Sequence, residues 1–148
     1  GQWQEWRDHD QLDWPLLAHG THQGLKAWAR DLNHLYASRP AFHRSDADAR
    51  GFEWLEVDNA QESIWAFLRR TDGVSPMACV FNGTPVPRPG HRLKLPQGGT
   101  WRKILDSDAA PYGGSGYNSQ ALIPAQSDGQ GWHLHVDLPP LGALFLEA

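Results

Sequence analysis

The spacing of apolar residues along this chain changes from a helical period to a strand period near residue 50. In residues 22–38, apolar side chains recur with the i, i+3, i+4, i+7 spacing of one helix face. They are Leu25, Trp28, Ala29, Leu32, Leu35 and Tyr36. The spacing predicts an amphipathic helix, with Thr21 as its N-cap and Pro40 shortly after its end. The segment LDWPLL before it predicts a short helical turn.

After Gly51, apolar and polar residues alternate as they do in half-buried strands. The clearest strand is WHLHVDL, whose core-facing residues would be Trp132, Leu134, Val136 and Leu138. Other predicted strands are FEWLEV, SIWAFLRR, MACVFNG, HRLKLP, TWRKILDSD and LGALFLEA, separated by turn residues such as TDGVSP, TPVPRPG, PQGG and SDGQG. The glycine-rich PYGGSGYNSQ is typical of a surface loop. This pattern predicts a mainly β fold, an antiparallel β-sandwich of about seven or eight strands.

The predicted helix has an unusually large apolar face for a helix at the start of a β-rich chain. One tryptophan, one tyrosine and three leucines on one face must pack against a large partner. We therefore expect that partner to precede residue 1, and the chain to be the C-terminal part of a longer protein.

Composition excludes several classes of protein. The net charge of −4 argues against binding to nucleic acid or to an anionic membrane, since both need a basic patch. No apolar run approaches the ~20 residues of a membrane span, and no stretch has the pattern of a secretion signal. The single cysteine, Cys79, excludes an internal disulfide and indicates a reducing compartment such as the cytoplasm. It lies in the apolar run MACVF, which predicts a buried thiol.

Three polar patterns could carry chemistry, and each has a plainer interpretation. His133 and His135 lie on one strand face and could ligate a metal, but further ligands are lacking and a solvent-facing polar row is favoured. The triplet DHD (residues 8–10) could bind a cation, although a solvated loop is favoured. Asp106 and Asp108 lack the continuation of an EF-hand and are predicted to end a strand. No motif of a nucleophilic triad or a phosphate loop is present.

The eight tryptophans are many for a chain of 148 residues. Because an indole either buries a large area or stacks on a planar or sugar ring, this composition is compatible with carbohydrate binding. Trp3 and Trp6 lie in irregular chain, where packing into a partner and exposure for stacking are both open. Four others lie in predicted strands and are expected in the core, although they could also serve as sugar platforms: Trp54, Trp65, Trp101 and Trp132.

Several long motifs follow one another along the chain: GQWQEWRDHDQLDWPLL, RDLNHLY, PAFHRSD, GFEWLEVDNAQESIWAFLRR, NGTPVPR and SDAAPYGGSGYNS. Together they resemble the C-terminal part of bacterial glycogen branching enzymes, members of the α-amylase superfamily, over essentially the whole chain. The resemblance implies that residues 1–50 are the end of a catalytic (β/α)8 barrel, a loop plus its last helix. It also implies that residues 51–148 form a C-terminal β-sandwich of the α-amylase type.

The resemblance implies a reaction for the parent enzyme. Such an enzyme cuts an α-1,4 bond of a glucan, holds the cleaved chain covalently and transfers it to a 6-hydroxyl, forming an α-1,6 branch in glycogen biosynthesis. Its partners would be α-glucans such as glycogen and amylose. The two Asp and one Glu that do this belong to the barrel and precede Gly1. We therefore expect no catalytic residue, metal or cofactor in this chain, and no activity from the chain alone.

The first residues would lie in a loop at the active-site end of the barrel. The family motif there usually reads GQWREWN, so Gln4 and Arg7 depart from it. We expect Trp3 and Trp6 to bind substrate by shaping or lining the glucan cleft. The helix of residues 22–38 would be the last outer helix of the barrel. In this chain we expect its apolar face to fold onto the β-region or to pair with a second copy, so that the chain self-associates or carries a mobile N-terminal arm.

Two alternatives stay open. A free-standing carbohydrate-binding module is favoured by the tryptophan content, but the unpartnered helix argues against it. The chain could also be the C-terminal part of another α-amylase-type enzyme, such as a maltosyltransferase or a debranching enzyme.

Overall fold

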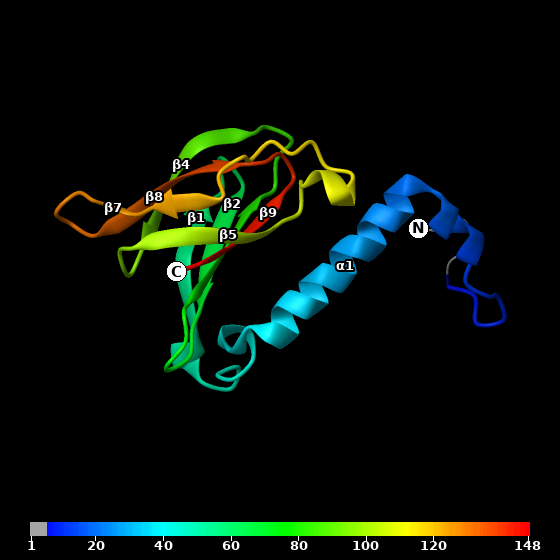
Figure 1. Cartoon of the computed structure of the whole chain (residues 1–148), viewed down its shortest axis with the longest axis horizontal. Coiled ribbons are helices and arrows are strands. Elements are labelled where there is room, and N and C mark those ends of the chain that lie inside the picture. The colour runs from blue at the N-terminus through cyan, green and yellow to red at the C-terminus, as the bar shows by residue number, and fades with distance from the viewer. Residues whose placement is uncertain (1–5) are drawn as a thin grey trace.

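The computed structural model describes residues 6–148, and one long helix precedes its β-region (Figure 1). That helix, α1, spans Gly20–Ser38. The other helices of the described residues are short 3₁₀ turns: η1 (Trp14–Ala18), η2 (Pro40–Phe42), η3 (Ala49–Gly51) and η4 (Ala110–Tyr112). The predicted turn in LDWPLL is therefore present as η1.

The β-region of the described chain is a sandwich of two antiparallel sheets. Its strands are β1 (Phe52–Asn59), β2 (Ile64–Arg69), β3 (Met77–Asn82), β4 (Arg88–Leu95), β5 (Thr100–Asp106), β6 (Leu122–Pro124), β7 (Gln126–Ser127), β8 (Trp132–Leu138) and β9 (Ala143–Glu147). The six-stranded sheet has the order β1-β2-β3-β9-β5-β6, and the three-stranded sheet has the order β4-β8-β7. The predicted fold class is confirmed.

The seven strands predicted from alternation are all present, as β1–β5, β8 and β9. The short strands β6 and β7 were missed because three and two residues are too few to show a period. Strand β4 begins at Arg88, before the predicted HRLKLP, because a register shift between Arg88 and His91 accommodates Pro89 and Gly90. PYGGSGYNSQ is a loop, as predicted, apart from the 3₁₀ turn that ends at Tyr112.

The core between the two sheets follows the strand alternation. In β2, Ile64, Ala66 and Leu68 point inward and are buried, while Trp65 and Phe67 point to the opposite face. The facing sheet contributes the apolar residues Leu93, Leu95, Leu134, Val136 and Leu138. Each fully buried leucine or valine stabilises the fold by roughly 1.5–3 kcal/mol relative to an exposed side chain.

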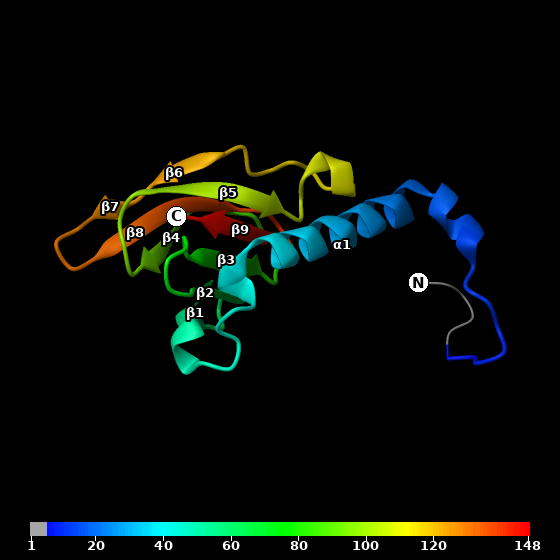
Figure 2. The ribbon, with the colours of Figure 1, turned by 60° about the horizontal axis from the view of Figure 1, so that its bottom comes forward.

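The outer face of the six-stranded sheet is apolar as well. Met77 and Cys79 of β3 and Phe145 of β9 are buried there, in a second core that includes Leu35 of α1. Burial raises the pKa of the Cys79 thiol to about 12, as expected for a structural cysteine. The smaller sheet therefore covers one face of this sheet, and α1 with its flanking segments covers part of the other (Figure 2).

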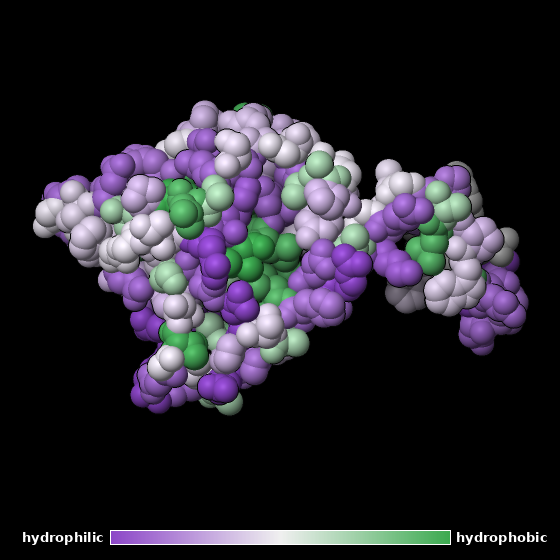
Figure 3. All heavy atoms as spheres, viewed as in Figure 1, coloured by the Kyte–Doolittle hydropathy of each residue, from purple (hydrophilic) through white to green (hydrophobic). Residues whose placement is uncertain are grey.

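Only part of the predicted apolar face of α1 reaches this second core. Leu35 is buried, and Trp28 and Leu32 pack partly against the sheet. Leu25 and Tyr36 are 63% and 49% exposed, so the prediction of one buried face was wrong for them. At 100° per residue, Leu25, Ala29 and Tyr36 lie about 60–120° around the helix from Trp28 and Leu35, on the far side of one wide apolar face, with Leu32 between the two groups. Figure 3 shows hydrophobic surface between α1 and the strands.

The start of α1 also differs from the prediction. The helix begins at Gly20, its N-cap is His19, and no side chain caps it, so Thr21 lies inside the first turn. Pro40 follows the end of the helix, as predicted, and starts η2.

Three contacts fasten α1 to the sandwich. The backbone of Gly24 lies so close to Tyr112 that an added Cβ would come within 2.3 Å of the Tyr112 carbonyl oxygen. The Tyr112 hydroxyl donates a 2.9 Å hydrogen bond to the Asp31 carboxylate. The pKa of this carboxyl is lowered, mainly by its hydrogen bond from Arg30 and further by the one from Tyr112. At the other end of the helix, Arg39 forms a 2.7 Å ion pair with Glu147 of β9. Glycine at position 24 is therefore a requirement of this packing.

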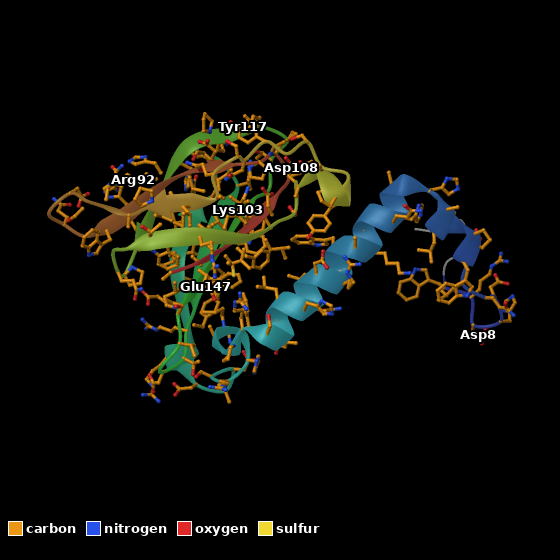
Figure 4. The ribbon with its side chains drawn as sticks, in the orientation of Figure 1. Asp8, Arg92, Lys103, Asp108, Tyr117 and Glu147 are labelled. Carbon is orange, nitrogen blue, oxygen red and sulfur yellow. The ribbon has the colours of Figure 1, made fainter. Side chains whose placement is uncertain are left out.

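The loop after β5 is ordered by one carboxylate. Asp108 accepts hydrogen bonds from the Ser115 backbone N–H at 2.8 Å, the Ser115 hydroxyl at 2.6 Å and the Tyr117 backbone N–H at 3.0 Å (Figure 4). Burial raises the pKa of Asp108, but these hydrogen bonds outweigh it and the net shift is downward. The DSD segment does end a strand, at Asp106, and its second aspartate organises the glycine-rich loop.

The Gly24 contact yields a prediction with a matched control. Gly24→Ala should lower the free energy of unfolding by about 1–3 kcal/mol, because the new methyl group meets backbone that cannot move aside. Gly20→Ala, in the same helix, meets nothing within 4 Å and should be neutral or stabilising by up to about 1 kcal/mol. Urea unfolding of both variants measures the difference. Equal stabilities would show that α1 does not pack on Tyr112.

Candidate functional site

Three of the four tryptophans expected in the core are on the surface. Trp101 is fully buried, but Trp54, Trp65 and Trp132 are 52%, 40% and 41% exposed. The core prediction was therefore wrong for these three. Large exposed aromatic side chains on a rigid sheet are candidates for ligand contact.

Trp54 is exposed because of where β1 lies. This strand is an edge of the six-stranded sheet, and a register shift between Trp54 and Glu56 interrupts its pairing with β2. Phe52 and Phe67 meet the indole at interplanar angles of 88° and 89°, so neither ring lies flat against it. The indole is held in place and still presents surface to solvent.

A groove of about 770 Å³ opens beside Trp54. Residues 54–61 form one wall, and Arg92 and Lys94 of β4 contribute the other. The groove thus lies where the edge strands of the two sheets approach each other. Its volume is within the range of ligand-binding pockets, roughly 300–1,000 Å³.

Hydrogen bonds fix the shape of this groove. Glu56 joins the two sheets through a 2.8 Å hydrogen bond between its carboxylate and Nε2 of His91 in β4. The Asn59 side-chain amide donates to Glu56 at 2.7 Å and to Glu62 at 3.0 Å. The second of these bonds is the main cause that lowers the pKa of Glu62, with Arg88 contributing further. The chain that forms the wall is therefore preorganised.

Other polar groups of the groove are available to a ligand. Within the described part of the chain, Asp58, Gln61 and Lys94 are exposed and make no side-chain hydrogen bond or ion pair. They offer an acceptor, an amide and a cationic donor in the groove that Trp54 also lines. An aromatic ring beside uncommitted hydrogen-bonding groups suits a polar ligand with flat, weakly polar faces, such as a sugar ring.

The same groove is a poor candidate for acid–base chemistry. A glycoside-cleaving site needs two carboxyl groups that flank the bond, one of them held as an acid. Glu56 is already hydrogen-bonded to His91 and Asn59, and Asp58 is exposed. The arrangement supports binding rather than bond cleavage.

The tryptophans expected to bind substrate lie elsewhere. Trp3 is outside the described residues. Trp6 is 99% exposed, has a positive φ of 64°, and lies in irregular chain before α1. Figure 4 shows Asp8 of the same segment and Arg92 of the groove at opposite ends of the molecule. The structure therefore does not bring Trp6 to the Trp54 groove.

The histidine pair of β8 is arranged differently from the prediction. His135 faces solvent, but His133 is buried, with the Arg92 guanidinium 3.5 Å from its Nδ1. The prediction of a solvent-facing row was therefore wrong for His133. The two rings lie 5.2 Å apart. Among residues 6–148, no three His, Cys, Asp or Glu side chains gather closely enough to hold a metal ion.

The DHD segment is an exposed loop, as favoured from the sequence. His9 lies 3.2 Å from Asp8 and 3.8 Å from Asp10, and Arg7 is 3.6 Å from Asp10. These local pairs contribute little stability, because exposed ion pairs are worth roughly 0–1 kcal/mol. None of the described helices has the length and apolar character needed to cross a membrane.

Comparison with known proteins agrees with this fold. Residues 54–148 match the family described as alpha amylase, C-terminal all-beta domain. A crystal structure of an alpha-amylase from H. orenii has a TM-score of 0.52 and 19% identity, over 83% of this chain and 20% of that one. The chain belongs to the family of alpha-amylase C-terminal all-beta domains.

Relatives in sequence identify more closely which kind of protein this chain resembles. The chain is 44% identical over 146 residues to the 1,4-alpha-glucan branching enzyme GlgB of Mesorhizobium japonicum. It is 46% identical over 149 residues to the GlgB of Pseudomonas aeruginosa. Both alignments cover 99% of this chain and 20% of the relative, so the chain spans about a fifth of these proteins. The resemblance to the C-terminal part of branching enzymes is confirmed.

Two signals in the sequence could have identified the exposed tryptophans. FEWLEVDN mixes acidic and apolar residues without clean alternation, which is typical of an edge strand. The paired glycines of PQGG precede β5, and Gly98 lies against the Trp132 ring. Consecutive glycines often mark a close approach of backbone to another group.

The exposures predict an order of chemical reactivity. Limited oxidation with N-bromosuccinimide, followed by peptide mass spectrometry, should modify Trp54, Trp65 and Trp132 while Trp101 remains intact. In denaturant all four should react alike, which serves as the control. Early oxidation of Trp101 in the folded chain would contradict the described core.

Proposed function

We propose that this chain is the C-terminal part of a 1,4-α-glucan branching enzyme, and that its β-sandwich holds glucan while the chemistry occurs elsewhere in the parent protein. The observation that supports this most strongly is the identity of more than 40% to GlgB proteins over nearly the whole chain. The proposed reaction cleaves an α-1,4 bond and transfers the chain to a 6-hydroxyl. The catalytic carboxylates would lie in the rest of the protein, so this chain has a binding and packing role.

The proposed domain division is residues 1–50 as the end of a catalytic barrel and residues 51–148 as the sandwich. The exposed stripe of α1, with Leu25, Ala29 and Tyr36, is where the barrel would pack. In the isolated chain the same stripe is the proposed surface for self-association. We also propose that Trp3 and Trp6 line the glucan cleft, and that the protein acts in a reducing compartment, the cytoplasm.

The activity is tested with the longer protein that carries this chain. It should convert linear amylose into a product with new α-1,6 linkages, detected by NMR or by release of short chains with a debranching enzyme. The 148-residue chain alone should form none. In the same assay Trp6→Ala in the longer protein should change kcat or the length of the transferred chain. A longer protein that only hydrolyses α-1,4 or α-1,6 bonds would contradict the proposal and favour another amylase-type enzyme.

The sandwich is proposed to contact glucan through the Trp54 groove. The support is the half-exposed indole, the groove of about 770 Å³ and the uncommitted groups Asp58, Gln61 and Lys94. Net charge and groove chemistry both favour a neutral polymer over a polyanion.

Trp54→Ala in the 148-residue chain should weaken maltotriose binding by roughly three- to tenfold, because one stacking surface is removed. Isothermal titration calorimetry measures the Kd. Trp65→Ala is the matched control, since it removes an indole of similar exposure that lies outside the groove. Equal affinities of both variants and the unmodified chain would refute a glucan site at Trp54.

A further inference from the structure

A row of aromatic rings crosses the outer face of the six-stranded sheet from β2 to β9. Trp65 and Phe81 are cross-strand partners, and their rings stack with centroids 5.4 Å apart and planes 5° from parallel. The Phe81 ring lies 6.2 Å from that of Phe145, which lies 6.1 Å from the Trp28 indole of α1. The helix therefore covers the Phe145 end of the row. At the other end, Trp65 belongs to neither hydrophobic core and is 40% exposed.

The Trp65 indole is fixed on the sheet and has apolar surroundings. One face of the ring lies flat against Phe81, and a Cβ added to Gly83 would lie 3.0 Å from its Cζ3 atom. The cross-strand neighbours in this row are Phe81 and Ala143, whose side chains carry no hydrogen-bonding group. A sugar site needs hydrogen-bonding groups beside the ring, so this surface suits contact with another apolar protein surface.

The two sides of α1 face different parts of the sheet. On one side, Gly24 and Asp31 contact Tyr112, in the turn η4 that follows β5. At 100° per residue, these two residues lie about 40–60° around the helix from Trp28. The exposed stripe of α1 lies about 60–100° from Trp28 in the opposite sense. The stripe therefore faces away from β5.

The stripe faces the part of the sheet that carries Trp65. Tyr36, its last residue, donates a 3.3 Å hydrogen bond to Asp46, and Asp46 forms an ion pair with Arg69 of β2. Figure 2 shows β5 on one side of α1, and β1 and β2 on the other. Only β3 separates β2 from β9, so these two strands lie about 9–10 Å apart. The stripe and the rings of Trp65 and Phe81 thus form the wall and the floor of one apolar corner.

We propose that this corner is a docking surface for the part of the longer protein that precedes this chain, and that Trp65 is its anchor on the sandwich. The inference rests on the proposed function and extends it, because that function placed the barrel against α1 alone. The chain spans a fifth of the GlgB relatives, so the other four-fifths of such a protein lies outside it. The uncovered rings continue the surface on which the barrel would pack, and an apolar partner on both walls would bury the Trp65 indole.

The test compares oxidation by N-bromosuccinimide in the longer protein and in the 148-residue chain, the latter at a concentration at which it is monomeric. Peptide mass spectrometry measures the rate at each tryptophan. Trp65 should react roughly tenfold more slowly in the longer protein, because the core of an interface excludes the reagent. Trp132, which is 41% exposed and lies on the smaller sheet, is the matched control and should react equally fast in both. Trp101 should stay intact in both, which shows that the sandwich is folded.

A pair of variants tests whether one body covers both walls of the corner. In the longer protein, Leu25→Lys should raise the oxidation rate of Trp65 by roughly three- to tenfold, because a charge desolvated in an interface weakens the docking. Leu122→Lys is the matched control, since Leu122 has the same exposure of 63% but lies in β6, on the other side of β5. In the 148-residue chain neither variant should change the rate at Trp65.

The outcomes separate this inference from the proposed function. If the longer protein forms α-1,6 linkages while Trp65 reacts equally fast in both proteins, the inference fails and the proposed function stands. If Trp65 is shielded but no α-1,6 linkage forms, the docking surface stands and the proposed reaction fails. Shielding of Trp65 only when the 148-residue chain is concentrated would identify a second copy as the occupant and would overturn the inference.

Discussion

The structure depends on one constraint: the six-stranded sheet is apolar on both faces. Strand β3 shows this most clearly, because Ala78 and Val80 face the inner core while Met77 and Cys79 face the outer one. A sheet of this kind needs a cover on each side, since either face left in water would cost several buried side chains at roughly 1.5–3 kcal/mol each. The smaller sheet covers one face, and the helix before the sandwich covers part of the other.

This constraint explains how α1 is divided. The residues that reach the sheet, Trp28, Leu32 and Leu35, lie on one side of the wide apolar face, and the sheet does not also cover the far side of that face. Leu25 and Tyr36 are therefore left exposed, although their spacing is as regular as that of the buried residues. An apolar face that is wider than the sheet can cover leaves room for a second neighbour. On the proposed function, that neighbour would be the barrel.

The sequence predicted the fold well where a period extends over many residues. The seven longer strands and α1 follow from alternation and helical spacing. The sequence could not predict which side chains near the ends of strands are buried, because their burial depends on residues distant in sequence. Trp101 and Trp132 lie in similar strand patterns, yet one is enclosed between the sheets and the other rests on Gly98 at the edge. His133 is buried and lies beside Arg92, a residue of the neighbouring strand. The Trp54 groove needs two edge strands from different sheets, and no pattern within one strand indicates that they meet.

The position of the Trp54 groove restricts the ligands that can link it to the proposed active site. Asp8, in the proposed barrel-rim segment, and Arg92, in the groove, lie at opposite ends of the molecule (Figure 4). Between them runs α1, whose 19 residues alone span about 28 Å. No single sugar could contact both places, but a polymer could. On the proposed function, the sandwich therefore acts through chain length: it holds a remote part of a long glucan and raises the local concentration of that chain at the cleft. Such remote binding raises the affinity for polymers and leaves the bond exchange to other residues. The groove agrees with this role, because the carboxylate of Glu56 is already hydrogen-bonded to His91.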